Sequence, residues 1–352
     1  MDKKRIIEWL KTEDQSALDD LWRQADKTRQ QEAGDEVHLR GLIEFSNYCR
    51  RKCGYCGLRA DNQSLNRYRM SQDEILQCVE QAVKFGYGTV VLQSGEDFGF
   101  STEWLEQIIK EIKKRTDLAV TLSVGERSME ELSRWKEAGA DRYLLRFETS
   151  NPRLYRRIHP PLPGEQSDRI SLLRRLRELG YEIGSGVMIG IPGQTYDDLA
   201  EDLITFQKLN LDMIGVGPFI PHGATPLQAD FEAARDRPEQ VRNTEGMTYK
   251  TIALARLQCP RANIPSTTAL ATLNKDQGRE LGLERGANVV MPNLTPPEYR
   301  ALYEIYPAKA CIAETAEQCH GCMKNRIRSM GRTIGQGRGD SPAYQHRPRG
   351  GN

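Results

Sequence analysis

The sequence predicts an α/β protein built on a parallel (β/α)8 barrel of the TIM type. From residue 37 onward, short apolar runs of strand character alternate with amphipathic segments of helical periodicity. Eight such units follow one another, and eight parallel strands are the number that closes a barrel. An open, doubly wound sheet is the alternative, but no G-x-G-x-x-G motif follows any of the predicted strands.

The strand and helix of each unit can be placed in chain order. The predicted strands cover residues 39–45, 89–96, 118–124, 142–148, 183–191, 213–220, 264–268 and 288–291. The predicted helices that follow them cover residues 71–85, 101–114, 128–138, 168–179, 196–209, 245–257, 277–285 and 298–305. The first of these helices begins at a capping box, because Ser71 and Glu74 stand three residues apart before an apolar run.

Four regions follow from this pattern. Residues 1–36 form an N-terminal helical extension, since residues 3–33 place apolar pairs at helical period among charges. Residues 37–306 form the barrel, and residues 307–331 form a cysteine-rich segment beyond it. Residues 332–352 are rich in Gly, Arg and Pro, so we expect a flexible basic tail.

Composition excludes several classes of partner. The 352 residues include 50 basic and 49 acidic side chains, so no net field attracts nucleic acid or an anionic membrane. No apolar run is long enough to span a bilayer, and the N-terminus lacks the apolar core of a signal peptide. The eight cysteines are spaced for metal rather than for a disulfide scaffold. We therefore expect a protein of a reducing compartment, the cytoplasm.

Three cysteines stand at the end of the first predicted strand. Cys49, Cys53 and Cys56 are spaced C-x₃-C-x₂-C, and thiolates suit Fe–S clusters, zinc and Cu(I). A zinc ribbon would need a second C-x₂-C knuckle, and none lies nearby. The cluster ferredoxins use a different run, C-x₂-C-x₂-C-x₃-C-P. The spacing therefore predicts a four-iron cluster with one iron free of protein ligands, and aromatic Tyr55 just before the third cysteine is a further specific feature.

Polar residues recur where the predicted strands end, and in a β/α barrel these ends form the mouth that carries the chemistry. Arg146 and Glu148 share one face of a strand, so they demand a ligand or pair with each other. Arg169 could offer a bidentate guanidinium to a carboxylate, although an ordinary surface arginine is the competing interpretation. The same mouth is predicted to receive Ser94, Gly95, Glu96, His222, Thr267 and Thr268, while a routine strand-end cap is the favoured interpretation of Glu126.

A second group of cysteines follows the barrel, with the spacing C-x₇-C-x₂-C. Cys311, Cys319 and Cys322 could bind zinc with His320 as the fourth ligand, or an Fe–S cluster with a non-cysteine ligand. Cys78 and Cys259 lie at apolar helical positions and are interpreted as core residues.

The cysteine loop, the Ser94-Gly95-Glu96 segment and the Ile191-Pro192-Gly193 turn resemble motifs of the radical S-adenosylmethionine (SAM) superfamily. The resemblance implies a [4Fe–4S] cluster on the three cysteines, with SAM on the open iron and Tyr55 beside its adenine. It implies a SAM site that also includes Gln93, Ser94, Gly95, Glu96, Arg146, Glu148, Arg169, Met291 and Tyr303. The implied activity is reductive cleavage of SAM to a 5′-deoxyadenosyl radical, with electrons from a ferredoxin- or flavodoxin-type donor.

Within that superfamily the segments I-E-F-S-N-Y-C-R-R-K-C-G-Y-C, V-L-Q-S-G-E-D and G-P-F-I-P-H resemble the HydE family of [FeFe]-hydrogenase maturases. The resemblance implies assembly of the H-cluster together with other maturases. The implied substrate is a sulfur-containing iron carbonyl–cyanide precursor. Its cavity would be lined by Thr121, Arg146, Met213, His222, Thr267 and Thr268. The C-x₇-C-x₂-C segment matches a second-cluster motif, [2Fe–2S] or [4Fe–4S], of part of that family.

Two alternatives stay open at this point. One is a radical mutase of the methylornithine synthase type, against which the second cysteine group is the distinguishing feature. The other is a non-catalytic Fe–S carrier or scaffold, which would need the cysteines but neither Glu96 nor Arg146. Biotin synthase is disfavoured, because its additional cluster cysteines on barrel strands have no counterpart in this chain.

Overall fold

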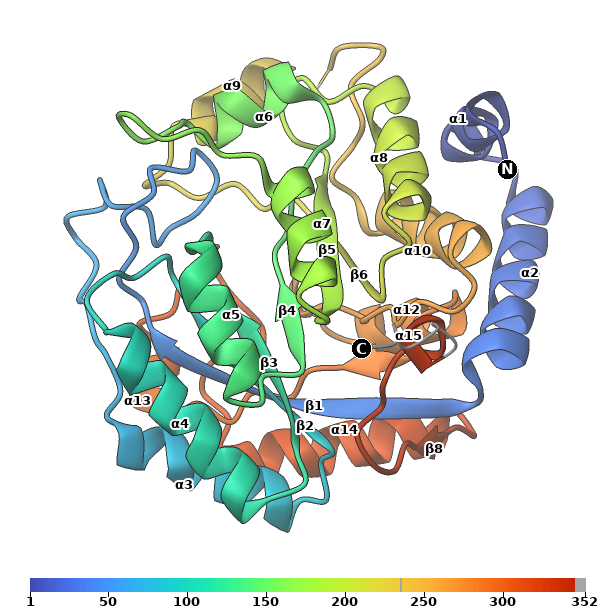
Figure 1. The fold of residues 1–352 in the computed structure, drawn as a ribbon. Helices are drawn as coiled ribbons and strands as arrows, with labels where there is room; N and C mark the ends of the chain where they lie inside the picture. The colour runs from blue at the N-terminus through green and yellow to red at the C-terminus, as the bar shows by residue number, and fades with distance from the viewer. Residues whose placement is uncertain (235, 346–352) are drawn as a thin grey trace.

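A curled parallel sheet forms the centre of the computed structural model, which describes residues 1–234 and 236–345 (Figure 1). The neighbouring strands pair in the order β6-β5-β4-β3-β2-β1-β7, and short β8 pairs with β1 beside this path. The strands are β1 (Glu36–Ser46), β2 (Thr89–Ser94), β3 (Ala119–Ser123), β4 (Arg142–Leu144), β5 (Glu182–Ile189), β6 (Met213–Pro218), β7 (Val289–Val290) and β8 (Thr333–Ile334).

Isolated bridges close the gap between β6 and β7. Asn263 pairs in parallel with Met213, and Pro265 pairs in parallel with Val289. The backbone N–H of Ile214 donates to the carbonyl of Asn263 at 2.9 Å, and that of Ser266 donates to the carbonyl of Val289 at 2.9 Å. The predicted barrel is therefore confirmed, although its seventh strand is reduced to these two bridges and its eighth to the two residues of β7.

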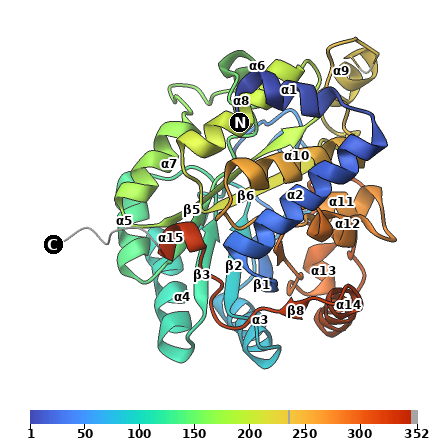
Figure 2. The same ribbon diagram turned by 90° about the vertical axis from the view of Figure 1, so that its right-hand side faces the viewer.

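Helices surround the sheet (Figure 1), and α1 and α2 pack against α8 and α10 on one side of it (Figure 2). The long helices are α1 (Lys3–Lys11), α2 (Gln15–Ala33), α3 (Gln72–Lys84), α4 (Thr102–Arg115), α5 (Met129–Glu137), α7 (Arg169–Glu178), α8 (Tyr196–Lys208), α10 (Glu245–Gln258) and α14 (Ala316–Ser329). The shorter ones are α6 (Pro152–Ile158), α9 (Leu227–Ala234), α11 (Thr268–Leu273), α12 (Gly278–Glu284), α13 (Pro297–Arg300) and α15 (Pro342–Gln345). Capping boxes start α3 and α5, at Ser71 with Glu74 and at Ser128 with Glu131.

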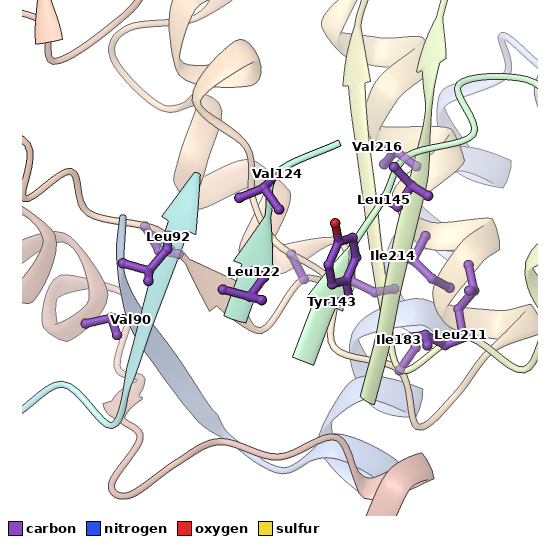
Figure 3. Packing of buried hydrophobic residues seen from close by; sticks show 14 of the residues in the cluster. Val90, Leu92, Leu122, Val124, Tyr143, Leu145, Ile183, Leu211, Ile214 and Val216 are labelled. Atoms are coloured by element: carbon purple, nitrogen blue, oxygen red, sulfur yellow. The ribbon is translucent and has the colours of Figure 1, made fainter. Parts of the chain in front are cut away.

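The strands separate an apolar outer layer from a polar interior. Figure 3 shows side chains of the outer layer, among them Leu122, Tyr143 and Ile183, which belong to one buried cluster that also contains residues of the surrounding helices. Because successive strand residues point to opposite faces, the residues between them face the inside of the barrel. Thr121, Arg142 and Glu182 occupy such positions and line one small interior cavity. The interior therefore carries charge and hydroxyl groups rather than a filled apolar core.

The C-terminal segment departs from the prediction of a flexible tail. β8 pairs with β1, and the carbonyl of Gly339 accepts hydrogen bonds from Arg40 Nη2 and Asn263 Nδ2, both at 3.0 Å. Arg142 Nη2 donates to the carbonyl of Arg338 at 2.9 Å and is paired with Asp340. The prediction is wrong for residues 332–345, because buried arginines at the N-terminal end of the barrel bind this backbone. Residues 346–352 lie outside the described part of the chain.

Among the described residues, the prediction also lacked five helices, α6, α9, α11, α14 and α15, of which α14 carries two cysteines of the second group. Among residues 1–234 and 236–345, no helix combines the length and the apolar character needed to cross a membrane.

Candidate active site

The cysteine loop lies between the C-terminal end of β1 and α3, held by backbone contacts from several directions. Gly54 N–H donates to the carbonyl of Ile158 at 2.7 Å, and Gly57 N–H donates to the carbonyl of Ile305 at 3.0 Å. Gly95 after β2 allows a close approach, because a Cβ atom there would lie 2.2 Å from the Tyr48 carbonyl oxygen and 2.8 Å from Cys49 Cβ. Gly95, which the resemblance places in the SAM site, thus also lets the backbone after β2 approach the cysteine loop.

The three thiols of the loop are near one another and largely removed from water. Burial raises the pKa of all three, that of Cys56 to about 12, while Arg169 opposes the effect at Cys53. Cys49 Sγ accepts from the backbone N–H of Glu96 at 3.4 Å. No three His, Cys, Asp or Glu side chains of residues 1–234 and 236–345 are arranged to hold one metal ion. Thiolates that each bind a different iron of a cluster need no such convergence.

Glu96 is held by protein groups on both of its carboxylate oxygens. Arg51 Nε donates to Oε1 at 2.6 Å, and the backbone N–H of Glu126 donates to Oε2 at 2.9 Å. Arg51 Nη2 also lies 3.3 Å from Glu126 Oε2. The pKa of Glu96 is raised by burial, with Arg51 acting in the opposite direction. In this conformation the Glu96 carboxylate holds the cysteine loop, and the carbonyls of Gly95 and Glu96 already accept from the backbone N–H groups of Asp97 and Arg50.

Arg169 is likewise engaged rather than free. It is buried at the start of α7, its Nε donates to Glu126 Oε1 at 2.9 Å, and its Nη1 donates to the carbonyl of Arg146 at 2.8 Å. Its Nη2 lies 3.3 Å from His159 Nε2. The competing interpretation as a surface arginine is wrong, because Arg169 is buried and joins the backbone after β4 to Glu126, between β3 and α5, and to His159 at the end of α6.

Arg146 and Glu148 combine strain with an unsatisfied polar atom. Arg146 Nη2 lies 3.0 Å from Glu148 Oε2 and donates to the carbonyl of Val187 at 2.7 Å. Glu148 has φ 61°, a left-handed conformation that non-glycine residues adopt at a cost of about 1–3 kcal/mol. Arg146 Nε is buried with no hydrogen-bond partner among the described residues, and Glu148 Oε2 has only the Arg146 guanidinium as its partner. The orphaned Nε atom is the strongest structural signal for a bound polar ligand.

The aromatic and thioether candidates surround the same mouth. Tyr55 packs partly buried on a small apolar cluster that includes Met188 and Phe219, and burial raises its pKa. Tyr303 is buried with Gln93 as a hydrogen-bonding neighbour, and burial raises its pKa also. The Ser94 hydroxyl donates to the carbonyl of Gly95 at 2.6 Å. Met291 is half-buried directly after β7.

The residues predicted to line the substrate cavity lie at two depths in the barrel, in its interior and at its mouth. Thr121 and Met213 line the small interior cavity with Arg40 and Arg142, and the Thr121 hydroxyl has no partner among the described residues. Met213 Sδ instead accepts from Arg40 Nη1 at 3.1 Å.

The other three lie at the mouth. Thr267 caps α11 with its hydroxyl, and Thr268 is 3.5 Å from Arg279 Nη2. His222 contacts the cysteine loop, because a Cβ atom on Gly57 would lie 2.6 Å from His222 Nε2.

The second cysteine group is brought together by α14 and the segment before it. Cys319 is buried and forms a hydrogen bond with Cys311, which lowers the pKa of Cys311 to about 6. Cys311 and exposed Cys322 line one cavity of about 320 Å³ with Arg279, Lys309 and Arg326. His320 Nδ1 lies 3.0 Å from the Tyr87 hydroxyl and its ring stacks on Phe85, and His320 is not among the residues that line this cavity.

Sequence reasoning missed Arg51 and His159 and assigned Glu126 a routine strand-end role. Arg51 stands inside the cysteine loop, which was the available signal, but its partners Glu96 and Glu126 come from other strands. His159 Nδ1 lies 3.0 Å from Cys53 Sγ although the two residues are 106 positions apart. No local pattern marks such a contact.

Comparison with known proteins agrees with this geometry. The model of the radical SAM superfamily matches residues 43–205, which contain the cysteine loop, Glu96, Arg146, Glu148 and Arg169. The [FeFe] hydrogenase maturase subunit HydE of Thermotoga maritima is 47% identical over 94% of this chain and 91% of that protein. The 3-methylornithine synthase of Methanosarcina barkeri is 28% identical over 82% of this chain and 78% of that protein.

Two solved structures share the fold. The crystal structure of methylornithine synthase (PylB) has a TM-score of 0.80 at 24% identity and covers 95% of this chain and 94% of its own. The structure of HydG, a maturase of the [FeFe]-hydrogenase, has a TM-score of 0.74 at 19% identity, over 93% of this chain and 74% of its own. The family is shown by the 47% identity to the Thermotoga maritima protein over 94% of this chain. The chain is a radical SAM enzyme and belongs to the HydE family of [FeFe]-hydrogenase maturases.

Proposed function

We propose that this enzyme cleaves SAM reductively and uses the resulting radical in assembly of the [FeFe]-hydrogenase H-cluster. The observation that carries the proposal is the 47% identity to the Thermotoga maritima maturase over 94% of the chain. That span includes both cysteine groups and all the polar residues at the barrel mouth. The fold alone would not choose between a maturase and a mutase, because the barrel is common to both.

We infer that Cys49, Cys53 and Cys56 hold the [4Fe–4S] cluster and leave one iron for SAM. When bound, the cluster supplies the single electron that cleaves SAM. The chain contributes the burial that keeps water from the site, and a tether through Arg51 and Glu96 that sets the position of the loop. Superfamily membership implies these cofactors, and the buried Glu148 carboxylate together with the orphaned Arg146 Nε fits a ligand with both ammonium and carboxylate groups.

The proposed SAM site has an acidic part and a basic part. The buried Glu148 carboxylate, whose partner is Arg146, suits an ammonium group, and the orphaned Arg146 Nε suits a carboxylate or ribose oxygen. Tyr55, Met291, Gln93 and Tyr303 supply the apolar and hydrogen-bonding wall. Arg169 acts through Glu126 and His159 and would position the loop rather than touch SAM.

For the substrate, we propose a small anionic organometallic complex that contains iron, carbonyl, cyanide and sulfur. The unpartnered Thr121 hydroxyl, the Arg146 guanidinium and the threonines at α11 support a polar, cation-bearing cavity. Met213 and His222 would line its lower and upper parts. Other hydrogenase maturases would supply or receive the complex, and a ferredoxin- or flavodoxin-type protein would supply the electron.

We propose further that Cys311, Cys319 and Cys322 bind a second Fe–S cluster. The proposal is supported by the hydrogen bond between Cys311 and Cys319 and by the cavity that Cys311 and Cys322 share. Basic Arg279, Lys309 and Arg326 around that cavity suit a cluster with anionic thiolates. His320 does not line that cavity, which favours an Fe–S cluster over a zinc site that uses this histidine.

Anaerobic reconstitution tests the proposed function. The reconstituted protein is incubated with SAM and dithionite, and 5′-deoxyadenosine is measured, followed by activation of an apo-[FeFe]-hydrogenase with the other maturases present. Cys53→Ser should abolish both signals, while Cys259→Ser, at the half-buried end of α10, should retain them. Absence of 5′-deoxyadenosine would point to the scaffold alternative. Deuterium exchange between an amino acid and 5′-deoxyadenosine, without hydrogenase activation, would point to the mutase.

A further inference from the structure

His159 is a buried side chain that touches the cysteine loop. It ends α6, is 1% exposed, and is followed by Pro160 and Pro161. Its Nδ1 lies 3.0 Å from Cys53 Sγ. Its Nε2 lies 3.2 Å from Glu126 Oε1 and 3.3 Å from Arg169 Nη2. Both nitrogens of the ring are therefore placed against chemically specific partners, and one of these is a cluster ligand.

Two arrangements of protons on a neutral imidazole satisfy these contacts. In the first, the Cys53 thiol donates to Nδ1, and Nε2–H donates to Glu126. In the second, Cys53 is a thiolate, Nδ1–H donates to its sulfur, and Nε2 accepts from Arg169 Nη2. A cysteine that binds iron is a thiolate and has no proton to donate. Cluster binding at Cys53 therefore selects the second arrangement.

The residues behind His159 hold that second arrangement in place. Arg169 can only donate, and its guanidinium is oriented by Glu126 at 2.9 Å and by the carbonyl of Arg146 at 2.8 Å. Glu126 Oε1 also accepts from the Ser167 hydroxyl at 2.7 Å. The His159 ring packs beside Tyr155, with 5.1 Å between the ring centroids. The imidazole therefore cannot turn away from Cys53 without breaking contacts on three sides.

We propose that His159 is a positioning residue that donates an N–H···S hydrogen bond to the Cys53 thiolate and raises the reduction potential of the cluster. Reduction adds one electron, and a donor at the sulfur stabilises the more negative, reduced form more than the oxidised form. The consequence is a cluster that a low-potential donor reduces more readily. The inference rests on the proposed cluster ligands and requires no turnover of SAM.

The test compares His159→Leu with His159→Asn. Asparagine can place an N–H near the position of Nδ1, whereas leucine has a similar volume and no donor. Both variants are made in a chain that carries Cys311→Ser and Cys322→Ser, so that one cluster gives the signal. The midpoint potential is measured by EPR during stepwise reduction with dithionite, and iron is counted per chain. We expect a lower midpoint potential for the leucine variant and a value near that of the parent for the asparagine variant.

A second measurement keeps the inference falsifiable if the leucine variant loses its cluster. Pulsed EPR of the reduced parent, grown with ¹⁵N-histidine, should show a weakly coupled histidine nitrogen that the asparagine variant lacks. An unchanged potential in a fully loaded leucine variant, or no histidine coupling in the parent, overturns the proposal. Both measurements are made on the cluster without turnover of SAM. Failure to form 5′-deoxyadenosine would therefore count against the proposed function but would not contradict this inference.

Discussion

Arg51 and Glu96 form a buried ion pair, with Arg51 Nε 2.6 Å from Glu96 Oε1 and both side chains less than 5% exposed. The pair joins the cysteine loop to the segment after β2. Glu96 therefore belongs to the scaffold of the cluster site, even though its position in the motif suggests ligand contact. Because Glu96 both holds the cysteine loop and stands in a ligand-binding motif, its replacement is the most informative one.

Replacement of Glu96 by alanine should destabilise the protein and reduce its cluster content. It leaves the Arg51 guanidinium buried without its main partner, which typically costs about 3–5 kcal/mol. Denaturant unfolding and iron analysis would measure the two effects. Glu103→Gln is the matched control, because Glu103 is 59% exposed in its pair with Arg134, and exposed pairs contribute about 1 kcal/mol or less. Equal losses in the two variants would contradict the role assigned to Glu96.

Gly95→Ala should displace the cysteine loop. The new Cβ would lie 2.2 Å from the Tyr48 carbonyl oxygen and 2.8 Å from Cys49 Cβ, so it has no room unless the loop moves. We expect a chain that folds but retains less iron after reconstitution, as seen by absorbance and iron analysis. Gly246→Ala is the control, because its Cβ meets nothing within 4 Å and alanine is the better helix residue there. Full iron content in Gly95→Ala would show that the loop can shift without loss.

Deletion of residues 332–352 should lower the thermal unfolding midpoint by several degrees. It removes the carbonyls of Arg338 and Gly339 from Arg142 and Arg40, and it removes Asp340, the second carboxylate of Arg142. Buried guanidinium groups would then lack acceptors. Deletion of residues 346–352 alone leaves these contacts in place and serves as the comparison. The same midpoint for both deletions would rule out a stabilising role for residues 332–345.

Asp202 should make the free energy of unfolding fall as the pH rises. Burial raises the pKa of this carboxyl from 3.8 to about 7, against hydrogen bonds from Ser150 that lower it. Between those values the folded protein binds more protons than the unfolded chain, so this group makes the unfolding free energy fall as pH rises. The slope is at most about 1.4 kcal/mol per pH unit.

Denaturant unfolding at pH 5 and pH 7.5 would detect this dependence. Asp202→Asn is neutral at both pH values, so its stability should fall less than that of the parent over the same interval. Parallel curves for the two proteins would show that Asp202 ionises normally in the folded state.

Cys311→Ser together with Cys322→Ser should remove the iron of the second cluster only. That site lies beyond the barrel, and its cavity is lined by residues of α11, α12, α14 and the segment before α14. Iron per chain should fall to the content of one [4Fe–4S] cluster, while 5′-deoxyadenosine formation persists. Unchanged iron content would contradict the second cluster, and loss of 5′-deoxyadenosine would show that the two sites are coupled.

Features that depend on neighbouring residues could be predicted from the sequence. The capping boxes at Ser71 and Ser128 start helices as expected, because their hydrogen bonds span three residues. Strand positions followed from apolar runs. Cys49, Cys53 and Cys56 could be predicted as a cluster site because one short loop supplies all three. The seventh strand was overestimated, since pairing at residues 263–265 is set by the neighbours β6 and β7 and reaches only two bridges.

The sequence by itself determined the barrel, its cysteine loop and the radical SAM family, because these depend on periodicity and on close spacing. Only the tertiary structure decided which charges meet. His159 reaches Cys53 across 106 positions, and Arg142 meets Asp340 across 198. A buried charge or ring nitrogen requires a partner, but the partner is chosen by how distant segments pack, which local sequence does not specify.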